Sequence, residues 1–260
     1  MLCREVIKII EETYPAAAAL EWDNVGLLAG RQEKEVKSVY VALDATDEVV
    51  DAAIAGGADL LVTHHPLIFG GLKRVTDGDF IGKRIVKLLQ NDISYYAMHT
   101  NYDVGRMAEL SCEKLNLKNA QVLEVTQVSE NGTEEGIGKI ADVPPVKLKE
   151  LCGRVKKAFD LDTVKIFGDP AKEVRRIAIC PGSGKSVIGE ALAKGADVLV
   201  TGDIGHHEGI DAVAQGLAVI DAGHYGIEHI FIRDMKEYLE QHIAGIRVQA
   251  AAISHPFLVL

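Results

Sequence analysis

Short apolar runs alternate with amphipathic stretches along most of the chain, and this alternation is typical of an α/β fold. Residues 4–14 carry apolar side chains at helical spacing. Residues 38–43, 47–55 and 59–63 then follow the pattern of a strand, a helix and a second strand. The run at 59–63 is short, rich in Leu and preceded by two glycines, which predicts a buried parallel strand. The same order of elements returns from residue 174.

A shift of 138 residues aligns these two stretches of the sequence. It pairs Gly-Ala-Asp at 57–59 with the same residues at 195–197, and ten of thirty aligned positions are identical. An internal duplication of a β-α-β unit explains this match. The alternative is that Gly-Ala-Asp before three apolar residues is a frequent junction between a helix and a strand. With the duplication, the fold is α/β, with two β-α-β-containing halves that form mainly parallel sheets.

The central residues 121–173 follow a different pattern and predict a smaller α+β insertion between the halves. A strand is expected near 136–142, and two prolines precede a helix over 146–159 and a further strand. We therefore divide the chain into a first α/β half at 1–120, this bridging segment, and a second α/β half at 174–260. The two halves are expected to pack as one unit.

Two adjacent histidines, His64 and His65, follow the apolar run at 59–63. Open α/β sheets bind their ligands at the carboxyl ends of parallel strands, so this doublet stands where a site is expected. Neighbouring side chains on a strand point to opposite faces, and the pair can serve one site only where the strand breaks. Pro66 supplies that break. The alternative is a pair of polar loop histidines without a common ligand.

Three further strand ends carry polar side chains of the same kind. Asp103 follows a strand at 93–98, and Asp203 follows the repeat of the 59–63 strand. His224 and Glu228 follow a strand at 217–222 and stand four residues apart, which places them on one face of a helix. That spacing alone is typical of a solvated helix face, so the prediction of a site depends on several strand ends meeting at one sheet edge.

The candidate residues make three imidazoles and two carboxylates: His64, His65, Asp103, His224 and Glu228. This mixture suits divalent Zn, Mn, Fe or Co. Five protein ligands exceed the three that are typical of one catalytic zinc ion. They suit two divalent metal ions per subunit if a carboxylate or a water molecule bridges the ions, an arrangement that generates a hydroxide nucleophile.

Composition narrows the classes of partner and the expected compartment. The net charge of −10 disfavours nucleic-acid binding, which needs basic patches against phosphates. The four cysteines stand far apart with no Cys-x-x-Cys pair, which argues against a zinc ribbon and fits a reducing cytoplasm. No apolar run approaches the roughly 18 residues that span a bilayer, and the first residues do not follow a signal-peptide pattern. We expect a cytoplasmic protein without a membrane partner.

Three other features have alternative interpretations. Gly-Ser-Gly-Lys-Ser at 182–186 resembles the end of a P-loop, but Ile179 stands where a P-loop needs glycine. The turn can still bind an anion at a helix N-terminus. His206 and His207 can form a separate metal pair, or one of them can orient a ligand of the main site. Trp22 is either a core residue or a residue that lines a site.

Five blocks of the sequence form a distinctive combination. They are Trp-Asp-Asn-Val-Gly-Leu at 22–27, Leu-Asp-Ala-Thr at 43–46, Asp-Leu-Leu-Val-Thr-His-His-Pro at 59–66, His-Thr-Asn-Tyr-Asp at 99–103, and Thr-Gly-Asp at 201–203 with His207, His224 and Glu228. At these blocks the sequence resembles a known family, the GTP cyclohydrolase 1 type 2 homologues, also described as NIF-three-like dinuclear metal proteins. The blocks follow the family order over nearly the whole chain.

The resemblance implies that the five candidate residues ligate a two-metal centre, with Glu228 as the bridge and His99 and His207 close by. It also implies a homo-oligomer, a hexameric ring. The expected activity is metal-dependent hydrolysis of a purine nucleotide or a related heterocycle, in which His99 or His207 transfers protons. The alternative is a metal-binding scaffold or metal chaperone that forms a ring-shaped oligomer without turnover. A ring that binds nucleic acid is disfavoured by the acidic composition.

Overall fold

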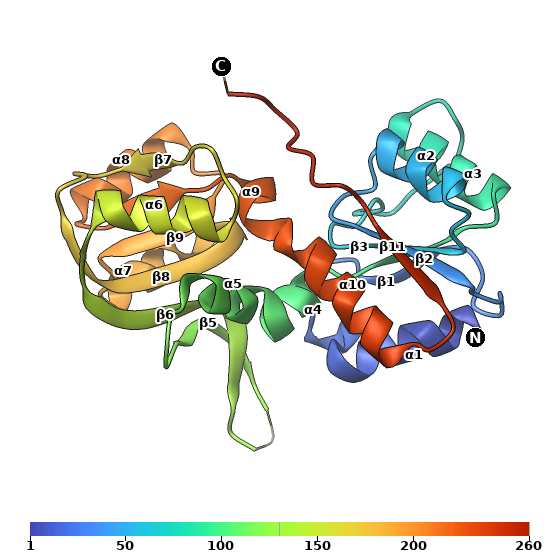
Figure 1. Cartoon of the computed structure of the whole chain (residues 1–260), viewed down its shortest axis with the longest axis horizontal. Coiled ribbons are helices and arrows are strands. Elements are labelled where there is room, and N and C mark those ends of the chain that lie inside the picture. Colours follow the sequence, from blue (N-terminus) through green and yellow to red (C-terminus); the bar gives the residue numbers. More distant parts are fainter. Residues whose placement is uncertain (130, 260) are drawn as a thin grey trace. The chain divides into compact units, whose positions relative to one another are not determined.

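The computed structural model describes residues 1–129 and 131–259, which form two compact units (Figure 1). The first unit consists of Met1–Tyr102 and Phe231–Ile253, and the second consists of Asp103–Ile230 and Ser254–Leu260. The chain therefore leaves the first unit after Tyr102 and returns to it at Phe231. The boundaries predicted after residues 120 and 173 divide the sequence into segments and are not the boundaries of these compact units. They stay a prediction, as does the packing of the two halves as one unit.

The first unit is built on a five-stranded sheet with the order β1-β4-β3-β2-β11. Strands β2, β3, β4 and β11 run parallel, and β1 is an antiparallel edge strand. Its strands are β1 (Gly26–Ala29), β2 (Ser38–Ala42), β3 (Leu60–Thr63), β4 (Ser94–Ala97) and β11 (Arg247–Ala250). Its helices are α1 (Cys3–Thr13), the 3₁₀ turn η1 (Ala16–Ala18), α2 (Asp47–Ala55), α3 (Phe80–Gln90), α4 (Thr100–Tyr102) and α10 (Ile230–His242), of which Ile230 belongs to the second unit.

Helices cover both faces of this sheet. Leu61 of β3 and Tyr95 of β4 pack in a buried cluster with residues of α2 and α3. On the opposite face, the Tyr96 hydroxyl donates to Glu11 of α1. All four residues of β3 are buried, because a central parallel strand between two helical layers has no solvated face. This is why the sequence shows a continuous apolar run at this point rather than an alternating one.

The second unit is built on a six-stranded sheet with the order β5-β6-β8-β9-β10-β7. Strands β8, β9 and β10 run parallel, and β5, β6 and β7 pair antiparallel. Its strands are β5 (Gln121–Val128), β6 (Glu134–Lys147), β7 (Lys165–Phe167), β8 (Glu173–Ser183), β9 (Val198–Gly202) and β10 (Ala218–Asp221). Its helices are η2 (Asp103–Met107), α5 (Ala108–Leu115), α6 (Leu148–Ala158), η3 (Gly184–Val187), α7 (Ile188–Ala193), α8 (His206–Ala214) and α9 (His224–Glu228).

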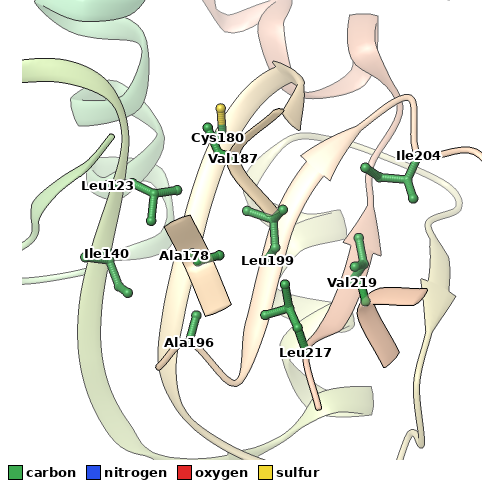
Figure 2. Packing of buried hydrophobic residues seen from close by; sticks show 12 residues of the cluster. Leu123, Ile140, Ala178, Cys180, Val187, Ala196, Leu199, Ile204, Leu217 and Val219 are labelled. Carbon is green, nitrogen blue, oxygen red and sulfur yellow. The ribbon is translucent and has the colours of Figure 1, made fainter. Parts of the chain in front are cut away.

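The central segment of the sequence thus supplies three strands to the sheet of the second half. Figure 2 shows the core on one face of this sheet, where Ala178, Leu199 and Val219 project from the three parallel strands. Leu123 and Ile140 extend the same cluster onto β5 and β6. The fold is therefore α/β with parallel β-α-β segments in both sheets, as the sequence predicted. Among the described residues, each helix is too short or too polar to span a bilayer.

The two halves repeat the same local structure, as a duplication requires. Strands β2 and β3 pair in parallel with Val39 opposite Leu60, and β8 and β9 pair in parallel with Ile177 opposite Val198. The second pair of partners is the first pair shifted by the 138 residues that align the sequences. Register is set by which side chains reach the core, so an identical register in both halves favours duplication over a chance junction.

The repeated Gly-Ala-Asp sequence has one structural role in both copies. Gly57 and Gly195 adopt φ of 60° and 68°, a left-handed conformation that glycine tolerates without strain. The Asp59 carboxylate accepts hydrogen bonds from the backbone N–H of Lys37 and Ser38, at 2.8 and 3.1 Å. The Asp197 carboxylate does the same for Arg175 and Arg176, at 2.7 and 2.9 Å. Each aspartate therefore links the start of its own strand, β3 or β9, to the backbone of the neighbouring parallel strand, β2 or β8.

We expect Asp59→Ala and Asp197→Ala each to reduce the free energy of unfolding by about 1–3 kcal/mol, since each leaves two backbone N–H groups without their carboxylate. Hydrogen exchange should accelerate at the amides of residues 37 and 38 in the first variant and of 175 and 176 in the second. The exposed Asp162 offers a matched control, and Asp162→Ala should change neither quantity. Equal exchange rates in the variants and the parent protein would contradict the shared role.

Candidate metal centre

Strand β3 ends at Thr63, so His64 and His65 lie just beyond it, where the proline was expected to break the strand. The two imidazole rings lie 4.9 Å apart between centroids. His64 is fully buried and packs against the ring of Phe231, whereas His65 is partly exposed. Thr63 stabilises the end of the strand, because its hydroxyl donates to the backbone carbonyl of His65 at 2.8 Å.

His99 follows β4, the next strand of the same sheet, and joins the histidine doublet. Its ring centroid lies 5.2 Å from that of His64 and 5.5 Å from that of His65. One nitrogen of each ring can serve as a metal ligand, and these three nitrogens lie within 4.8 Å of one another. The first unit therefore contains a three-histidine grouping of the composition that zinc sites use.

Each of these histidines has its Nδ1 atom hydrogen-bonded to a protein acceptor. His64 Nδ1 donates to the backbone carbonyl of Met98 at 3.0 Å, a contact that fixes the Nδ1–H tautomer because a carbonyl cannot donate. His65 Nδ1 lies 2.7 Å from a carboxylate oxygen of Asp44, and His99 Nδ1 lies 2.9 Å from one of Asp23. Metal-binding histidines are usually oriented in this way, which directs Nε2 toward the ion.

Asp23 is the most heavily hydrogen-bonded of these acceptors, and its side chain is completely buried. Besides His99, it accepts from the backbone N–H and the hydroxyl of Thr100, at 2.9 and 2.6 Å, and from the N–H of Asn24 at 2.8 Å. Burial by itself raises the pKa of Asp23, but the hydrogen bonds from His99 and Thr100 outweigh it and hold the pKa well below its usual value. Asp23 is therefore negatively charged beside His99 near neutral pH.

In the second unit, α9 places His224 and Glu228 on one face, as the four-residue spacing predicted. His224 Nε2 lies 3.0 Å from a carboxylate oxygen of Glu228, and the Glu228 side chain is 3% exposed. His224 Nδ1 lies 2.9 Å from a carboxylate oxygen of Asp203, the residue that follows β9. The carboxylate–histidine arrangement of His65 and His99 is therefore present here as well.

Asp103 lies on the same unit, at the first residue of the π-helical turn η2. Such turns are rare and frequently mark functional sites. A carboxylate oxygen of Asp103 lies within 4.8 Å of one of Glu228. Both carboxylates also affect Cys180: burial is the main cause that raises the pKa of this thiol, and the charges of Asp103 and Glu228 raise it further. The second unit thus gathers one histidine and two carboxylates.

The glycine-rich stretch at 182–186 lies against Glu228 and against Thr201 of β9. Gly182 has a φ of 74°, and a Cβ atom at this position would collide with a carboxylate oxygen of Glu228. A Cβ atom on Gly184 would collide with the hydroxyl of Thr201. Both glycines are therefore explained by close packing around Glu228 and β9, and a phosphate-binding loop is not needed to account for them.

We expect Lys185→Ala to leave nucleotide affinity and any turnover nearly unchanged, because a lysine outside a P-loop has no fixed phosphate to bind. Calorimetric titration with GTP and with ATP checks this. As a control, Lys236→Ala removes another lysine, one that pairs with Glu240 on α10. A tenfold loss of triphosphate affinity in Lys185→Ala alone would show that the loop does bind phosphate.

The structure also settles the position of Trp22. Its side chain is 57% exposed and lies edge-on to the ring of His99, with centroids 5.9 Å apart. The interpretation of Trp22 as a core residue is therefore wrong, and it lies beside the three-histidine grouping.

His207 lies exposed in the first turn of α8, with its ring 5.1 Å from that of His206. Its part in proton transfer stays a prediction.

The sequence did not predict that Asp23 orients His99 or that Asp44 orients His65. The two residues of each pair are distant in sequence, and the carboxylates come from loops that carry no metal-site pattern of their own. Both aspartates do lie within blocks that carry the family resemblance, at 22–27 and 43–46.

Comparison with known proteins shows the family of the chain. The model of the family Duf34/NIF3 (NGG1p interacting factor 3) matches residues 1–256. The chain belongs to the Duf34/NIF3 family. It is 38% identical over 247 residues to the GTP cyclohydrolase 1 type 2 homolog of Streptococcus pneumoniae, covering 93% of this chain and 91% of that protein. The protein of the same name from Clostridium acetobutylicum is 33% identical over 239 residues, covering 91% and 89%.

A solved structure shows that the resemblance extends to the fold. The Bacillus cereus protein related to NIF3 superimposes with a TM-score of 0.93 at 26% identity, covering 100% of this chain and 99% of that one. The family and the α/β fold expected from the sequence are thus confirmed. Groupings of His, Asp and Glu that can hold a metal ion are present in the Duf34/NIF3 chain.

Proposed function

We propose that this Duf34/NIF3 protein is a metal-dependent hydrolase that acts on a purine nucleotide or a related heterocycle. The proposed ligands of two divalent metal ions are His64, His65, Asp103, His224 and Glu228. The observation that carries the proposal is that ring nitrogens of His64 and His65 lie within 4.8 Å of each other, with an acceptor on each Nδ1 atom. His99, held by Asp23, lies beside them as the proposed proton donor. A chance gathering of histidines has no reason to orient all of its rings in this way.

The donor set fits the proposed metals. Imidazole nitrogens suit Zn, Fe and Co, and the added carboxylates suit Mn as well. When bound, two such ions supply a hydroxide nucleophile near neutral pH. Glu228 is buried, and its carboxylate lies 3.0 Å from the imidazole of His224. Burying a carboxylate is favourable only where a positive charge lies beside it, and bound divalent ions would supply that charge.

The part of the reaction that we assign to this chain's own side chains is proton transfer. His99 Nδ1 lies 2.9 Å from the buried carboxylate of Asp23, which orients the ring. We propose that His99 holds the proton that the leaving ring nitrogen of the substrate needs. His207 is the second candidate for this role. By its resemblance to its relatives, the protein is also proposed to act in the cytoplasm as a hexameric ring of identical subunits.

A metal-reconstitution experiment tests the proposal. The purified full chain is treated with a chelator, reloaded with Zn, Mn, Fe or Co, and incubated with GTP, other nucleotides and phosphoesters while the purine absorbance is followed. We expect turnover that depends on metal. We also expect His65→Ala to lower the metal content while the thermal melt stays close to that of the parent protein.

The exposed His242, on α10 of the same unit, offers a matched control, and His242→Ala should keep its metal. Full metal retention in His65→Ala would remove His65 from the ligand set. Metal binding without turnover of any substrate in the panel would favour the alternative function, a metal-binding scaffold or metal chaperone.

A further inference from the structure

Two large aromatic side chains of the first unit are exposed side by side. Trp22 is 57% exposed and Phe69 is 54% exposed. Their ring centroids lie 5.8 Å apart, and the planes are inclined by 36°. Solvent-exposed indole and phenyl rings that contact each other leave apolar faces in water, and such patches commonly mark binding sites.

Hydrogen bonds hold these two rings in place relative to each other. The amide of Asn24, two residues after Trp22, donates to the backbone carbonyl of Ile68, next to Phe69, at 2.6 Å. The intervening Asp23 is bound to His99 and Thr100. The loop with Trp22 is therefore tied both to the loop with Phe69 and to the residues after β4.

The same hydrogen bonds set the position of the aromatic pair relative to the histidines. The centroid of the His99 ring lies 5.9 Å from that of Trp22 and 6.4 Å from that of Phe69. The ring planes are inclined by 75° and 67°, so His99 lies edge-on to both rings. His99 in turn lies against His64 and His65. A flat ring that rests on Trp22 or Phe69 would therefore lie beside the imidazole of His99.

We propose that Trp22 and Phe69 form a stacking platform that binds the heteroaromatic ring of the substrate and sets its position beside His99. This inference rests on the proposed function and adds to it the residues that select a substrate with a planar ring. Stacking suits this role because every nucleobase has a π-face, so the platform distinguishes compounds with a ring from those without one. Stacking does not distinguish one base from another, so that choice would depend on hydrogen bonds to the polar atoms of the base.

The chain contains another exposed aromatic residue that does not share these features. Phe80, on α3, is 62% exposed and lies against the guanidinium group of Arg84, 5.1 Å from the ring centroid. Its exposure is similar to that of Trp22 and Phe69, but its neighbour is a guanidinium group rather than a second aromatic ring. Phe80→Leu is therefore a matched control for Trp22→Leu and Phe69→Leu.

Trp22 is the single tryptophan of the chain, so its fluorescence reports on the platform alone. The metal-loaded full chain is titrated with guanosine and GTP, and separately with ribose 5-phosphate and inorganic triphosphate. We expect guanosine and GTP to quench the emission in a saturable manner and the two compounds without a base to have no effect. Quenching by inorganic triphosphate, with none by guanosine, would overturn the proposal in favour of phosphate recognition.

Calorimetry on the variants then tests the residues themselves. Trp22→Leu and Phe69→Leu should each weaken the binding of guanosine and GTP by about tenfold or more, as is typical when a stacked aromatic is removed. Trp22→Phe should restore most of the affinity. Metal content and the thermal melt should stay unchanged in all of these variants, and Phe80→Leu should bind both ligands like the parent protein.

The outcomes separate the platform from the hydrolase. If the parent protein binds guanosine without turnover and Trp22→Leu loses this binding, the platform stands and the hydrolase proposal fails. If turnover occurs and both leucine variants bind GTP like the parent protein, the platform is wrong and the hydrolase stands. Failure of the parent protein to bind guanosine or GTP overturns the platform. So does a change of sedimenting mass in Trp22→Leu, which would assign the patch to contacts between copies of the chain.

Discussion

Replacing Glu228 by glutamine is expected to remove or weaken both of the proposed metal ions. Five ligands cannot fill two separate three-ligand shells, since six would be needed, and a shared carboxylate resolves the count. Glu228 is the best candidate for this shared ligand because it is buried, lies 3.0 Å from His224 and has a carboxylate oxygen within 4.8 Å of one of Asp103. Glutamine keeps the size of the side chain but removes the charge that offsets the two dications.

Comparison with Asp103→Asn makes this prediction specific. A terminal ligand mainly serves its own ion, so Asp103→Asn should lower the content by about one ion per chain, whereas Glu228→Gln should lower it toward zero. Elemental analysis gives the stoichiometry, and anomalous scattering from crystals of both variants soaked in one metal gives the occupancy of each position. Full occupancy of one position in Glu228→Gln would mean that the ions do not share this carboxylate.

A surface glutamate provides the control for the change of charge. Glu190 is exposed on α7 of the same unit, and Glu190→Gln should keep both ions. The packing of Gly182 against the Glu228 carboxylate gives a second check. Gly182→Ala should displace Glu228 and reproduce part of the metal loss, although it leaves every proposed ligand in place.

The periodicity of the sequence predicts the parallel strands because their pattern is local. Strand β3 is buried on both faces, so its residues had to be continuously apolar, and the polar doublet had to follow the end of the strand. The repeat was predictable for a similar reason. Gly57 and Asp59 have a fixed conformation and fixed hydrogen bonds, which the second copy at 195–197 needs as well.

Features that depend on contacts between distant segments were not predictable in this way. Periodicity does not specify which strands pair, so nothing in residues 121–173 indicated that β5, β6 and β7 join the sheet of the second half. The exposure of Trp22 is a similar case. Indole rings are usually buried, and it is the hydrogen bonds of the neighbouring Asp23 and Asn24 to distant loops that keep this one at the surface.

Asp23 is the residue for which we expect the largest loss of stability. Asp23→Asn should reduce the free energy of unfolding at pH 7 by about 2–3 kcal/mol, because the hydrogen bonds that Asp23 accepts from Thr100 and His99 are strengthened by its charge. The carboxylate is fully buried, so solvent does not screen these interactions. Asparagine fits the space but presents an N–H group to donors on one side.

The pH dependence follows from the lowered pKa of Asp23. In the unfolded chain an aspartate has a pKa of about 3.9, and in the folded protein the pKa of Asp23 lies below that value. Stability from this group is therefore fully present above the unfolded pKa and is lost as the pH falls toward the folded pKa. Asp23→Asn cannot titrate, so the difference in stability between the variant and the parent protein should be constant from pH 7 to about 5 and should shrink below about 4.

Urea unfolding at a series of pH values measures this difference directly. The exposed Asp77, in the same unit, offers the matched control, and Asp77→Asn should follow the parent protein at every pH. A difference that stays constant down to pH 3 would mean that packing rather than charge makes Asp23 important. A difference that shrinks with acid supports a buried anion next to His99, which is the charge that the proposed proton transfer requires.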